Sequence, residues 1–405
     1  MVVTERLRLK PREDRRLRGG HVWIYSNEVD TGVTPLKGFE PGEEAILENA
    51  QGRPLGRVLV NPQALICARL FSRDPAQGFD EAFLRERLEA ALRLRTQCYG
   101  DSGCYRLVYG ESDGLSGLVI DRFGAVVVVQ TSTAGMDRHL PKVLEVLEAL
   151  LSPTSIVLKQ DSGARSLEGL EEAVTVHGQP LDGPVLLEEN GVTFAAPVLE
   201  GQKTGWFYDH RENRARLAPL CRGARVLDAF SYVGAWGLTA LAQGAASLVA
   251  VDSSQRALEH LEANAERLGV RDRTETRRGD AFALLEAQAD AGERFDVVIV
   301  DPPALIKRRK DLKAGQHGYE RLARQALRLT APGGLCLFAS CSLHFDRAML
   351  TDTLRSAARH TERSVQMLWS HGAGLDHPVH PAIPETDYLK ATLVRVSPPG
   401  RGGAF

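Results

Sequence analysis

The sequence predicts an α/β protein in three parts: a small β-barrel, a central α+β domain, and a C-terminal domain built on a parallel, doubly wound sheet. Three observations predict this fold. Short apolar runs broken by turn residues occupy residues 1 to 75, a helical pattern begins at Phe79, and apolar strands alternate with helices from Gly191 onward. We therefore place the domain boundaries at 1–75, 76–189 and 190–405.

The first part contains apolar segments too short for helices, each next to turn residues such as glycine, asparagine and proline. Strands this short and this closely spaced favour a small barrel. Trp23 and Tyr25 could stack on bases, but at alternating strand positions they are expected to fill the barrel core. The segments are Val22–Tyr25, Glu44–Leu47 and Leu65–Phe71.

The second part mixes helical and strand patterns. From Phe79 to Cys98 the apolar residues recur with helical spacing and form one broad face. A second helix is expected at about Met136–Leu151. The strands predicted around it are Leu118–Asp121, Ala125–Gln130 and Ile156–Lys159.

The third part opens with the nucleotide end of a β-α-β unit. A strand ends at Asp228, a loop of small residues follows, a helix opens near Ala235, and the next strand ends at Asp252, 24 residues after Asp228. The loop lacks early glycines that would admit a pyrophosphate, because Phe230–Tyr232 stands in their place. An adenosine without a pyrophosphate fits better, and S-adenosylmethionine is the obvious such ligand.

Further strands of this part end in residues with polar or reactive side chains, namely Asp280, Asp301 and Cys341. Ligands bind beyond the carboxyl ends of parallel strands, so these residues should share one edge with Asp228 and Asp252. One acid at a strand end is more often a solvated loop residue, but four in register favour a site. Asp252 is expected to accept from the ribose hydroxyls, and Asp280 from the adenine amino group.

Composition is that of an ordinary soluble protein: 43% of residues are apolar, 25% are charged, and the formal net charge is −2. The basic residues within 1–20 are a local feature. No apolar run could span a bilayer, and the N-terminus lacks the apolar core of a signal peptide. The six cysteines are scattered without a C-x-x-C pair, so we expect neither disulfides nor a metal site, and a cytoplasmic location.

The tetrad Asp301-Pro302-Pro303-Ala304 follows a strand of Val and Ile, and similar tetrads occur in enzymes that methylate amino groups or ring atoms of bases. Cys341 ends the next strand in chain order. Carbon 5 of cytosine is a poor nucleophile until a thiolate adds at carbon 6, and an acid near ring nitrogen 3 stabilises the adduct. If the two strands are neighbours, Cys341 and Asp301 would provide these two groups. Cys336 lies mid-strand and is assigned to the core.

Several segments resemble the bacterial large-subunit ribosomal RNA cytosine-5 methyltransferases that carry an N-terminal PUA domain, and the resemblance spans nearly the whole chain. It implies a PUA barrel, a central α+β domain and a class I (Rossmann-like) methyltransferase domain, with Cys341 as the attacking thiol. Relatives often carry Gln at the position of His210. The matching segments are His21–Tyr25, Gly110–Leu115, Lys203–Gly205, Asp209–Arg211, Asp301–Ala304, Ser340–Ser342, Asp376–Pro378 and Tyr388–Lys390.

The site expected from the residues and the resemblance has three groups of side chains. Cys341 and Asp301 are the catalytic pair, and the base that removes the carbon 5 proton is unassigned. The proposed cofactor contacts are Tyr208, Asp228, Phe230, Ser231, Tyr232, Gly234, Asp252, Ser253, Asp280, Ala281, Asp301 and Pro302. The proposed RNA contacts are Lys203, Arg211, Lys307, Arg308, Arg309 and Lys310.

Three functional hypotheses stay open from the sequence. The leading one is an S-adenosylmethionine-dependent enzyme that forms 5-methylcytosine in large-subunit ribosomal RNA. The second keeps the cofactor site but methylates a guanine nitrogen, with an inert Cys341. The third is a non-catalytic RNA-binding assembly factor, which the intact series of strand-end acids disfavours. The expected partner is ribosomal RNA, with neither a membrane nor a metal, and a homodimer is left open.

Overall fold

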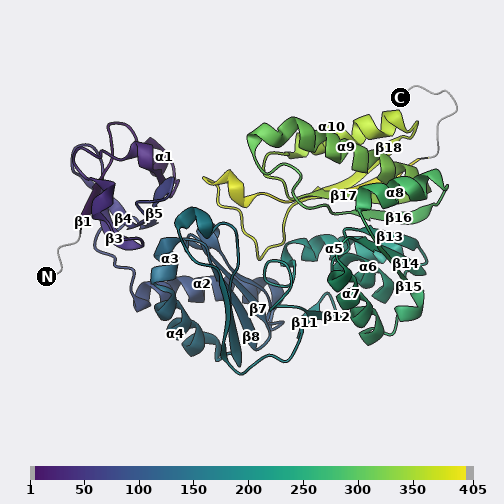
Figure 1. Ribbon diagram of the computed structural model, residues 1–405, viewed down its shortest axis with the longest axis horizontal. Helices are drawn as coiled ribbons and strands as arrows, with labels where there is room; N and C mark the ends of the chain where they lie inside the picture. Colours follow the sequence, from purple (N-terminus) through teal and green to yellow (C-terminus); the bar gives the residue numbers. More distant parts are fainter. Residues whose placement is uncertain (1–4, 398–405) are drawn as a thin grey trace. The chain divides into compact units, whose positions relative to one another are not determined.

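A computed structural model describes residues 5–397, which form two compact units (Figure 1). The first unit contains residues up to 185 together with 197–208 and 375–386, and the second contains 186–196, 209–374 and the chain from 387 onward. Two short segments that the sequence assigned to the C-terminal part thus belong to the first unit. The loose tail expected at Pro398–Phe405 lies outside the described residues.

The N-terminal part of the first unit is a five-stranded sheet in the order β1-β3-β4-β5-β2. β1 pairs with β3 in parallel and the other pairs are antiparallel. The inward residues, among them Leu7, Ile24, Ala45 and Val58, are fully buried in one apolar cluster. The elements are β1 (Glu5–Arg8), α1 (Arg15–Arg18), β2 (Trp23–Tyr25), β3 (Glu43–Glu48), β4 (Pro54–Val60) and β5 (Ile66–Ser72).

The expectation that Trp23 and Tyr25 fill the barrel core is wrong. Ile24, which lies between them on β2, is the buried residue, and alternate residues of a strand face opposite sides. The Trp23 indole Nε1 donates to Glu111 at 2.9 Å, and the Arg16 guanidinium lies 5.0 Å from the centre of the Tyr25 ring. Both aromatic rings are therefore half-buried outside the core.

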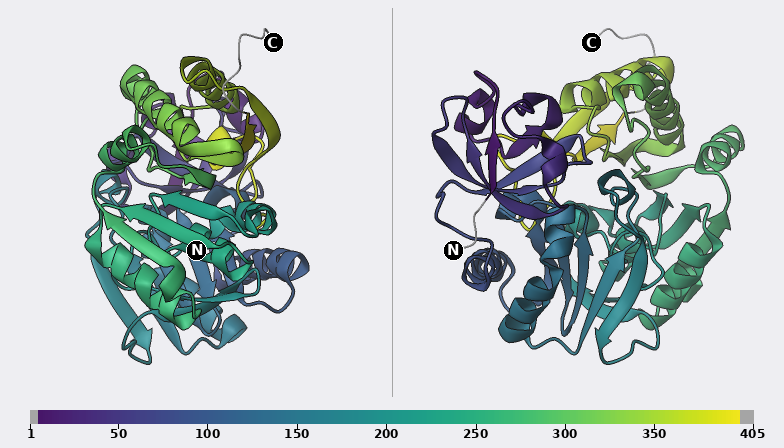
Figure 2. Two further views of the ribbon diagram at one scale, coloured as in Figure 1. Left: turned by 90° about the vertical axis from the view of Figure 1, so that its right-hand side faces the viewer. Right: turned by 60° about the vertical axis from the view of Figure 1, so that its left-hand side comes forward.

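The central part of the first unit is a five-stranded sheet in the order β10-β9-β8-β7-β6 (Figures 1 and 2). Helices α2 and α4 share one apolar core with the strands of this sheet. The helix expected at Met136–Leu151 is two helices, because Pro141 in the first turn of the second has no amide hydrogen to continue the first. The elements are α2 (Glu81–Tyr99), β6 (Cys104–Tyr109), β7 (Leu118–Phe123), β8 (Val126–Thr131), α3 (Ala134–Arg138), α4 (Leu140–Leu151), β9 (Ser155–Gln160) and β10 (Ala173–Gly178).

The second unit contains a seven-stranded sheet in the order β15-β14-β13-β16-β17-β19-β18. β13 to β17 run parallel, and β19 is antiparallel to both of its neighbours. Helices α8, α9 and α10 share one core on one face, and α6 and α7 lie on the other face (Figure 1).

The sheet elements of the second unit are β13 (Arg225–Ala229), β14 (Ser247–Asp252), β15 (Thr274–Arg278), β16 (Phe295–Val300), β17 (Thr330–Ser340), β18 (Val365–His371) and β19 (Lys390–Val396). The helices are α5 (Arg211–Leu217), α6 (Ala235–Ala242), α7 (Gln255–Arg267), α8 (Ala281–Asp290), α9 (Leu312–Leu329) and α10 (Arg347–His360). β11 (Val185–Glu189) and β12 (Val192–Ala196) form a separate two-stranded sheet.

The chain order reverses between β13 and β16, because β14 and β15 lie on one side of β13 while β16 and β17 lie on the other. Such a reversal leaves a crevice at the carboxyl ends of the two central strands, where ligands bind in open α/β sheets. Asp228, Asp252, Asp301 and Cys341 all lie at this edge, as the sequence predicted.

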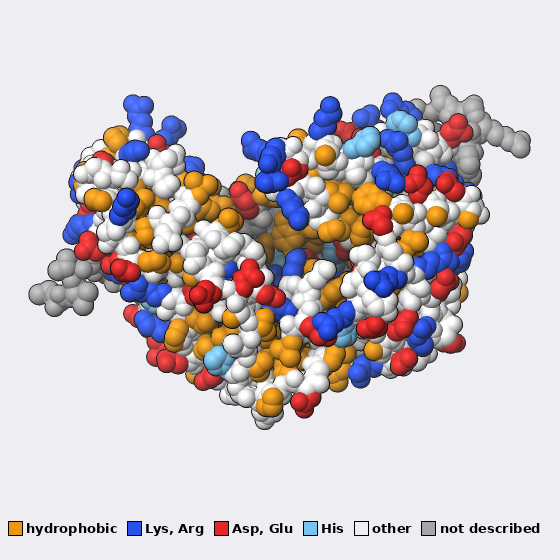
Figure 3. All heavy atoms as spheres, in the orientation of Figure 1, with side chains coloured by type: hydrophobic (Ala, Val, Ile, Leu, Met, Phe, Trp, Pro, Cys, Tyr) orange, Lys and Arg blue, Asp and Glu red, His pale blue; other side chains and the backbone are white. Residues whose placement is uncertain are grey.

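Surface charge is mixed in sign. Basic and acidic side chains are interspersed over the face in Figure 3, in agreement with the net charge of −2. Among the helices of residues 5–397, none has both the length and the apolar character that a membrane crossing requires.

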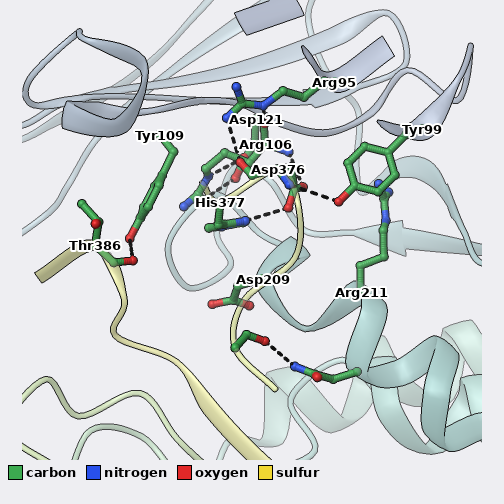
Figure 4. A network of polar contacts seen from close by, with 12 residues as sticks. Arg95, Tyr99, Arg106, Tyr109, Asp121, Asp209, Arg211, Asp376, His377 and Thr386 are labelled. Atoms are coloured by element: carbon green, nitrogen blue, oxygen red, sulfur yellow. Dashed lines mark hydrogen bonds and ion pairs between the residues drawn. The ribbon is translucent and has the colours of Figure 1, made fainter. Parts of the chain in front are cut away.

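The segment 375–386 is anchored within the first unit by the buried Asp376 (Figure 4). Its carboxylate accepts from the Arg106 amide at 2.9 Å and lies 2.7 Å from His377 Nδ1, and its own amide donates to the Tyr99 hydroxyl at 3.1 Å. The Arg95 guanidinium, which is also fully buried, donates to the Asp376 carbonyl at 2.8 Å. These bonds explain the Asp376–Pro378 motif as a structural anchor.

Candidate active site

The loop after β13 turns sharply and brings the start of α6 against the strand. Phe230, Tyr232 and Gly234 have φ values of 64°, 49° and 89°, in the left-handed region that non-glycine residues enter at a cost of about 1 kcal/mol or more. Gly237 allows the close approach, because a Cβ there would lie 2.5 Å from the Leu248 side chain. Strained backbone of this kind is typical of functional sites.

Asp252 closes this loop with both of its carboxylate oxygens. Oδ2 accepts from the Tyr232 amide at 2.9 Å, and Oδ1 accepts from the Ser254 amide at 2.9 Å. Ser254 in turn caps α7, where its hydroxyl accepts from the Ala257 amide at 3.2 Å, and the neighbouring Ser253 is exposed. Each carboxylate oxygen has lone pairs to spare, so the half-buried Asp252 can still accept from ligand hydroxyls.

Two buried polar atoms in the same loop have no hydrogen-bond partner within residues 5–397: Asp228 Oδ1 and Ser231 Oγ. The other Asp228 oxygen accepts from the Gly237 amide at 2.9 Å. Burial, together with the nearby charges of Asp301 and Asp252, raises the pKa of Asp228 to about 8. Buried polar atoms are almost always paired in native proteins, so these two are suited to a polar ligand.

The next strand end adds a carboxylate and an aromatic pair. Asp280 caps α8, where its Oδ1 accepts from the Ala283 amide at 3.0 Å, and its exposed position leaves acceptor capacity for a ligand. Ala281 is buried beneath it. The rings of Phe230 and Phe282 meet edge to face with centroids 6.4 Å apart, which provides apolar surface beside the acids.

Asp301 is held by two donors that the sequence did not predict as its partners. His210 Nε2 lies 3.2 Å from Asp301 Oδ2, and the Trp236 indole Nε1 donates to the same oxygen at 3.1 Å. Burial acts to raise the pKa of Asp301, but the charge and hydrogen bond of His210 and the bond from Trp236 outweigh it, so the pKa lies below its usual range. Asp301 is thus an ionised acceptor.

His210 is 3% exposed and is held in place on its other side by Asn213, whose amide nitrogen lies 3.2 Å from His210 Nδ1. The same amide nitrogen donates to the Gly372 carbonyl at 2.9 Å. The Asn213 amide nitrogen can only donate to Nδ1, so Nε2 is the ring nitrogen whose hydrogen points to Asp301. His210 therefore orients the carboxylate.

Cys341 directly follows β17, and β17 pairs in parallel with β16, which ends just before Asp301. The condition set by the sequence, that the two strands be neighbours, is confirmed. Cys341 Sγ lies 4.0 Å from the Pro302 carbonyl and is partly exposed. Cys336 is fully buried in the core, as predicted, and burial raises the pKa of its thiol to about 12.

A hydroxyl network behind Cys341 connects its turn to the loop after β16. The Tyr319 hydroxyl of α9 lies 2.7 Å from Ser342 Oγ and accepts from Ser340 Oγ at 2.8 Å. Ser342 Oγ also accepts from the Ile306 amide at 3.0 Å. Cys341 and the Asp301–Ala304 loop are thus fixed to each other through Tyr319, a residue that no sequence pattern marked.

Two of the predicted contacts, Tyr208 for the cofactor and Lys203 for RNA, belong to the first unit. Tyr208 belongs to the first unit, where it is fully buried and its hydroxyl donates to the Arg122 carbonyl at 2.9 Å. Lys203, also in the first unit, is exposed, with its ammonium 4.6 Å from the Phe207 ring centre.

The basic residues of the second unit differ in accessibility. Arg211, predicted as an RNA contact, is 5% exposed and its Nε lies 3.7 Å from Glu189, so its side chain is too buried to contact RNA phosphates. Lys307, Arg308, Arg309 and Lys310 are all exposed after β16, although Arg308 pairs with Asp311 at 3.1 Å.

Two family models match the chain. One describes a PUA-like domain and matches residues 7–73, and the other, described as conserved hypothetical protein 95, matches residues 213–312. The first match covers the N-terminal barrel, and the second covers β13 to β16 with the loop that carries Asp301.

Two curated relatives match almost from end to end. The ribosomal RNA large subunit methyltransferase I of Shewanella denitrificans is 34% identical over 397 residues, which cover 96% of this chain and 99% of the relative. The ribosomal RNA large subunit methyltransferase of Deinococcus radiodurans is 34% identical over 404 residues, which cover 96% and 97%.

Solved structures share the fold at lower identity. A Streptococcus mutans protein described as a candidate S-adenosylmethionine-dependent methyltransferase matches with a TM-score of 0.80 at 18% identity, over 97% of this chain and all of that one. A second such structure, complexed with S-adenosylhomocysteine, matches with a TM-score of 0.82, also at 18% identity and with the same coverage. These matches confirm the predicted fold class: an α/β methyltransferase domain preceded by a PUA-like barrel.

Proposed function

The chain belongs to the family of the ribosomal RNA large subunit methyltransferases, and from this premise we propose that it methylates carbon 5 of a cytosine in large-subunit ribosomal RNA. The observation that carries the proposal is the placement of Cys341 beside the Asp301 loop, on neighbouring parallel strands, with Sγ 4.0 Å from the Pro302 carbonyl. A methyltransferase that acts on a ring nitrogen has no need of a thiol at this position.

The residues at the switch point fit S-adenosylmethionine. Asp252 offers acceptors for ribose hydroxyls, while Asp228 Oδ1 and Ser231 Oγ are buried polar atoms without a partner in the described chain. The Phe230 and Phe282 rings would offer an apolar wall to the adenine, and Asp280 would accept from its amino group. When bound, the cofactor supplies an electrophilic methyl group on a sulfonium.

The chemistry assigned to Cys341 and Asp301 follows from the electronic demand of cytosine. The Cys341 thiolate forms a bond to carbon 6, which makes carbon 5 nucleophilic enough to take the methyl group. As this bond forms, ring nitrogen 3 takes a proton from solvent water, and Asp301, ionised by its contacts with His210 and Trp236, accepts a hydrogen bond from it. After methylation the protons on carbon 5 and nitrogen 3 leave to solvent. The electron pair of the carbon 5–hydrogen bond re-forms the double bond to carbon 6, the sulfur–carbon bond breaks, and 5-methylcytosine and the Cys341 thiolate are released.

The Tyr319 network contributes by fixing geometry. Attack at carbon 6 and support of nitrogen 3 require thiol and carboxylate to approach one ring from set directions. Ser340 and Ser342, which flank Cys341, both form hydrogen bonds with the Tyr319 hydroxyl. Ser342 Oγ also accepts a hydrogen bond from the Ile306 amide, in the loop that follows Asp301. The two catalytic side chains therefore share one rigid support.

Trapping with fluorinated RNA tests the proposal. Fluorine at carbon 5 cannot leave as a proton, so large-subunit ribosomal RNA transcribed with 5-fluorocytidine should hold the wild-type enzyme as an adduct stable on denaturing gels. Cys341→Ala should give neither adduct nor turnover, yet bind S-adenosylmethionine normally. Cys336→Ala is the matched control and should retain both, losing only stability because it empties a buried position.

Methylation by Cys341→Ala at a near wild-type rate would overturn the proposal. In that case the thiol is structural, and nucleoside analysis of the product would show whether a guanine nitrogen carries the methyl group. If the wild type bound RNA but not S-adenosylmethionine in calorimetry, the non-catalytic assembly factor would instead be favoured.

A further inference from the structure

Lys390 is a buried lysine at the turn that carries Cys341. It is the first residue of β19, and β19 runs antiparallel to β17 with Lys390 opposite Ser340, the residue before Cys341. Its side chain is only 3% exposed. A lysine is seldom buried to this extent unless its charge has a partner, because removing an ammonium from water is costly.

One of the two polar contacts of Lys390 is with the residue that follows Cys341. Nζ donates to the Ser342 carbonyl at 2.7 Å and to the Tyr388 carbonyl at 2.7 Å. An ammonium has three N–H bonds, and no acceptor within residues 5–397 is bonded to the third. The ammonium is thus held against the backbone of the residue after Cys341 with one donor to spare.

Carboxylates do not neutralise this ammonium. Among the described residues Lys390 makes no ion pair with an acid. Burial lowers the pKa of Lys390 to about 8, and the positive charge of Arg347 also lowers it. Negative charge at Cys341 opposes this lowering most strongly, followed by the charges of Asp387 and Asp346. A thiolate at Cys341, whose turn Lys390 contacts through the Ser342 carbonyl, would therefore favour the ammonium more than Asp387 or Asp346 does.

We propose that the Lys390 ammonium activates Cys341 by stabilising its thiolate, while the thiol proton leaves to solvent. This inference rests on the proposed role of Cys341 as nucleophile and gives Lys390 a positioning and charge-balancing role toward it. The thiol proton leaves to solvent before attack, the Sγ–carbon 6 bond then forms, and release of the product regenerates the thiolate beside the same ammonium. Lys390 keeps its proton through the cycle.

Alkylation of the full-length protein tests the proposal without RNA. The rate at which iodoacetamide modifies each cysteine is followed from pH 5 to 10 by peptide mass spectrometry, since only the thiolate reacts. In the wild type, the midpoint for Cys341 should lie at least one pH unit below that of Cys98, a partly exposed thiol that serves as internal reference. A Cys341 midpoint equal to that of Cys98 would overturn the proposal, and this comparison requires no variant.

Variants extend the test. Lys390→Met fills the same volume without charge and should raise the Cys341 midpoint by at least one pH unit, which corresponds to a tenfold slower alkylation at pH 7, while the Cys98 profile stays unchanged. Lys390→Arg keeps the charge and should restore most of the reactivity. An unaltered Cys341 midpoint in a folded Lys390→Met protein would show that the lysine is structural.

The fluorinated-RNA trap separates this proposal from the proposed function. If Lys390 acts as inferred, Lys390→Met should form the adduct at least tenfold more slowly at pH 7, and raising the pH to 9 should recover much of the rate. An adduct that forms at the wild-type rate in Lys390→Met would sink the inference while leaving Cys341 as nucleophile. If the wild type forms no adduct but Cys341 still titrates with Lys390, the ion pair stands and the cytosine chemistry fails.

Discussion

Asp252→Ala should weaken both the β13 loop and the cofactor site. The carboxylate accepts from two backbone amides, those of Tyr232 and Ser254, each at 2.9 Å. Hydrogen bonds to charged groups contribute about 1.5–3 kcal/mol each, and partial exposure of Asp252 discounts this. We expect the free energy of unfolding to fall by roughly 1–3 kcal/mol, because Tyr232 also loses the contact that supports its left-handed backbone.

The affinity for S-adenosylmethionine should fall more steeply than stability alone predicts. Two ribose hydroxyls would lose a charged acceptor, and about 1.4 kcal/mol corresponds to a tenfold change in affinity. We therefore expect the dissociation constant measured by isothermal titration calorimetry to be at least tenfold larger. Asp252→Asn, which keeps one carbonyl acceptor and nearly the same shape, should lie between wild type and Asp252→Ala in both measurements.

The control is Glu266→Ala, which removes an exposed acid from α7, the helix that follows Asp252, and should change neither quantity. Unfolding is followed by urea titration without cofactor, so that stability and affinity are measured independently. An unchanged dissociation constant for Asp252→Ala would refute the assignment of the ribose to this strand end, and with it the placement of the cofactor at the switch point.

Two further predictions concern charge. Replacing Lys307–Lys310 with Gln should flatten the salt dependence of RNA binding without affecting cofactor affinity, because exposed cations that neutralise phosphates release counterions; an identical salt slope would make the run a solvated loop. For Asp228, the pKa of about 8 in the folded protein exceeds the ordinary value of 3.8, so the stabilisation that this group contributes without cofactor should be fully present below about pH 4 and should be lost as the pH rises toward 8. The slope should approach about 1.4 kcal/mol per pH unit, Asp228→Asn should abolish the decline in urea unfolding, and an equally steep decline in that variant would contradict the burial of this carboxyl.

The strand-end residues of the site could be predicted from the sequence because their signal is local. A run of branched apolar residues that ends in an acid predicts both the strand and the edge where the side chain emerges, which placed Asp228, Asp252 and Asp301 correctly. Cap residues such as Ser254 are equally local, since the hydroxyl bonds an amide three residues away. The resemblance to a known enzyme family, which spans nearly the whole chain, identified the N-terminal barrel as a PUA-like domain.

Local sequence patterns gave wrong predictions where the orientation of a side chain depends on packing against another element. The alternation at Trp23–Tyr25 correctly predicted one buried face, but the expected face was wrong, because the core contains Ile24. The apolar pattern over 136–151 did not show that Pro141 divides it into two helices. Arg211 reads as a basic side chain available to phosphate, but the fold buries it next to Glu189.

The sequence by itself determined the order of the elements, the fold class, and the residues that end the central strands, because each depends on chain neighbours. Only the tertiary structure decided which distant side chains meet: His210 and Trp236 at Asp301, Tyr319 between the two catalytic loops, and Lys390 opposite Ser340. The reason is that a side-chain contact between separate elements depends on strand register and helix placement, and these are fixed by packing of the whole sheet rather than by any local pattern.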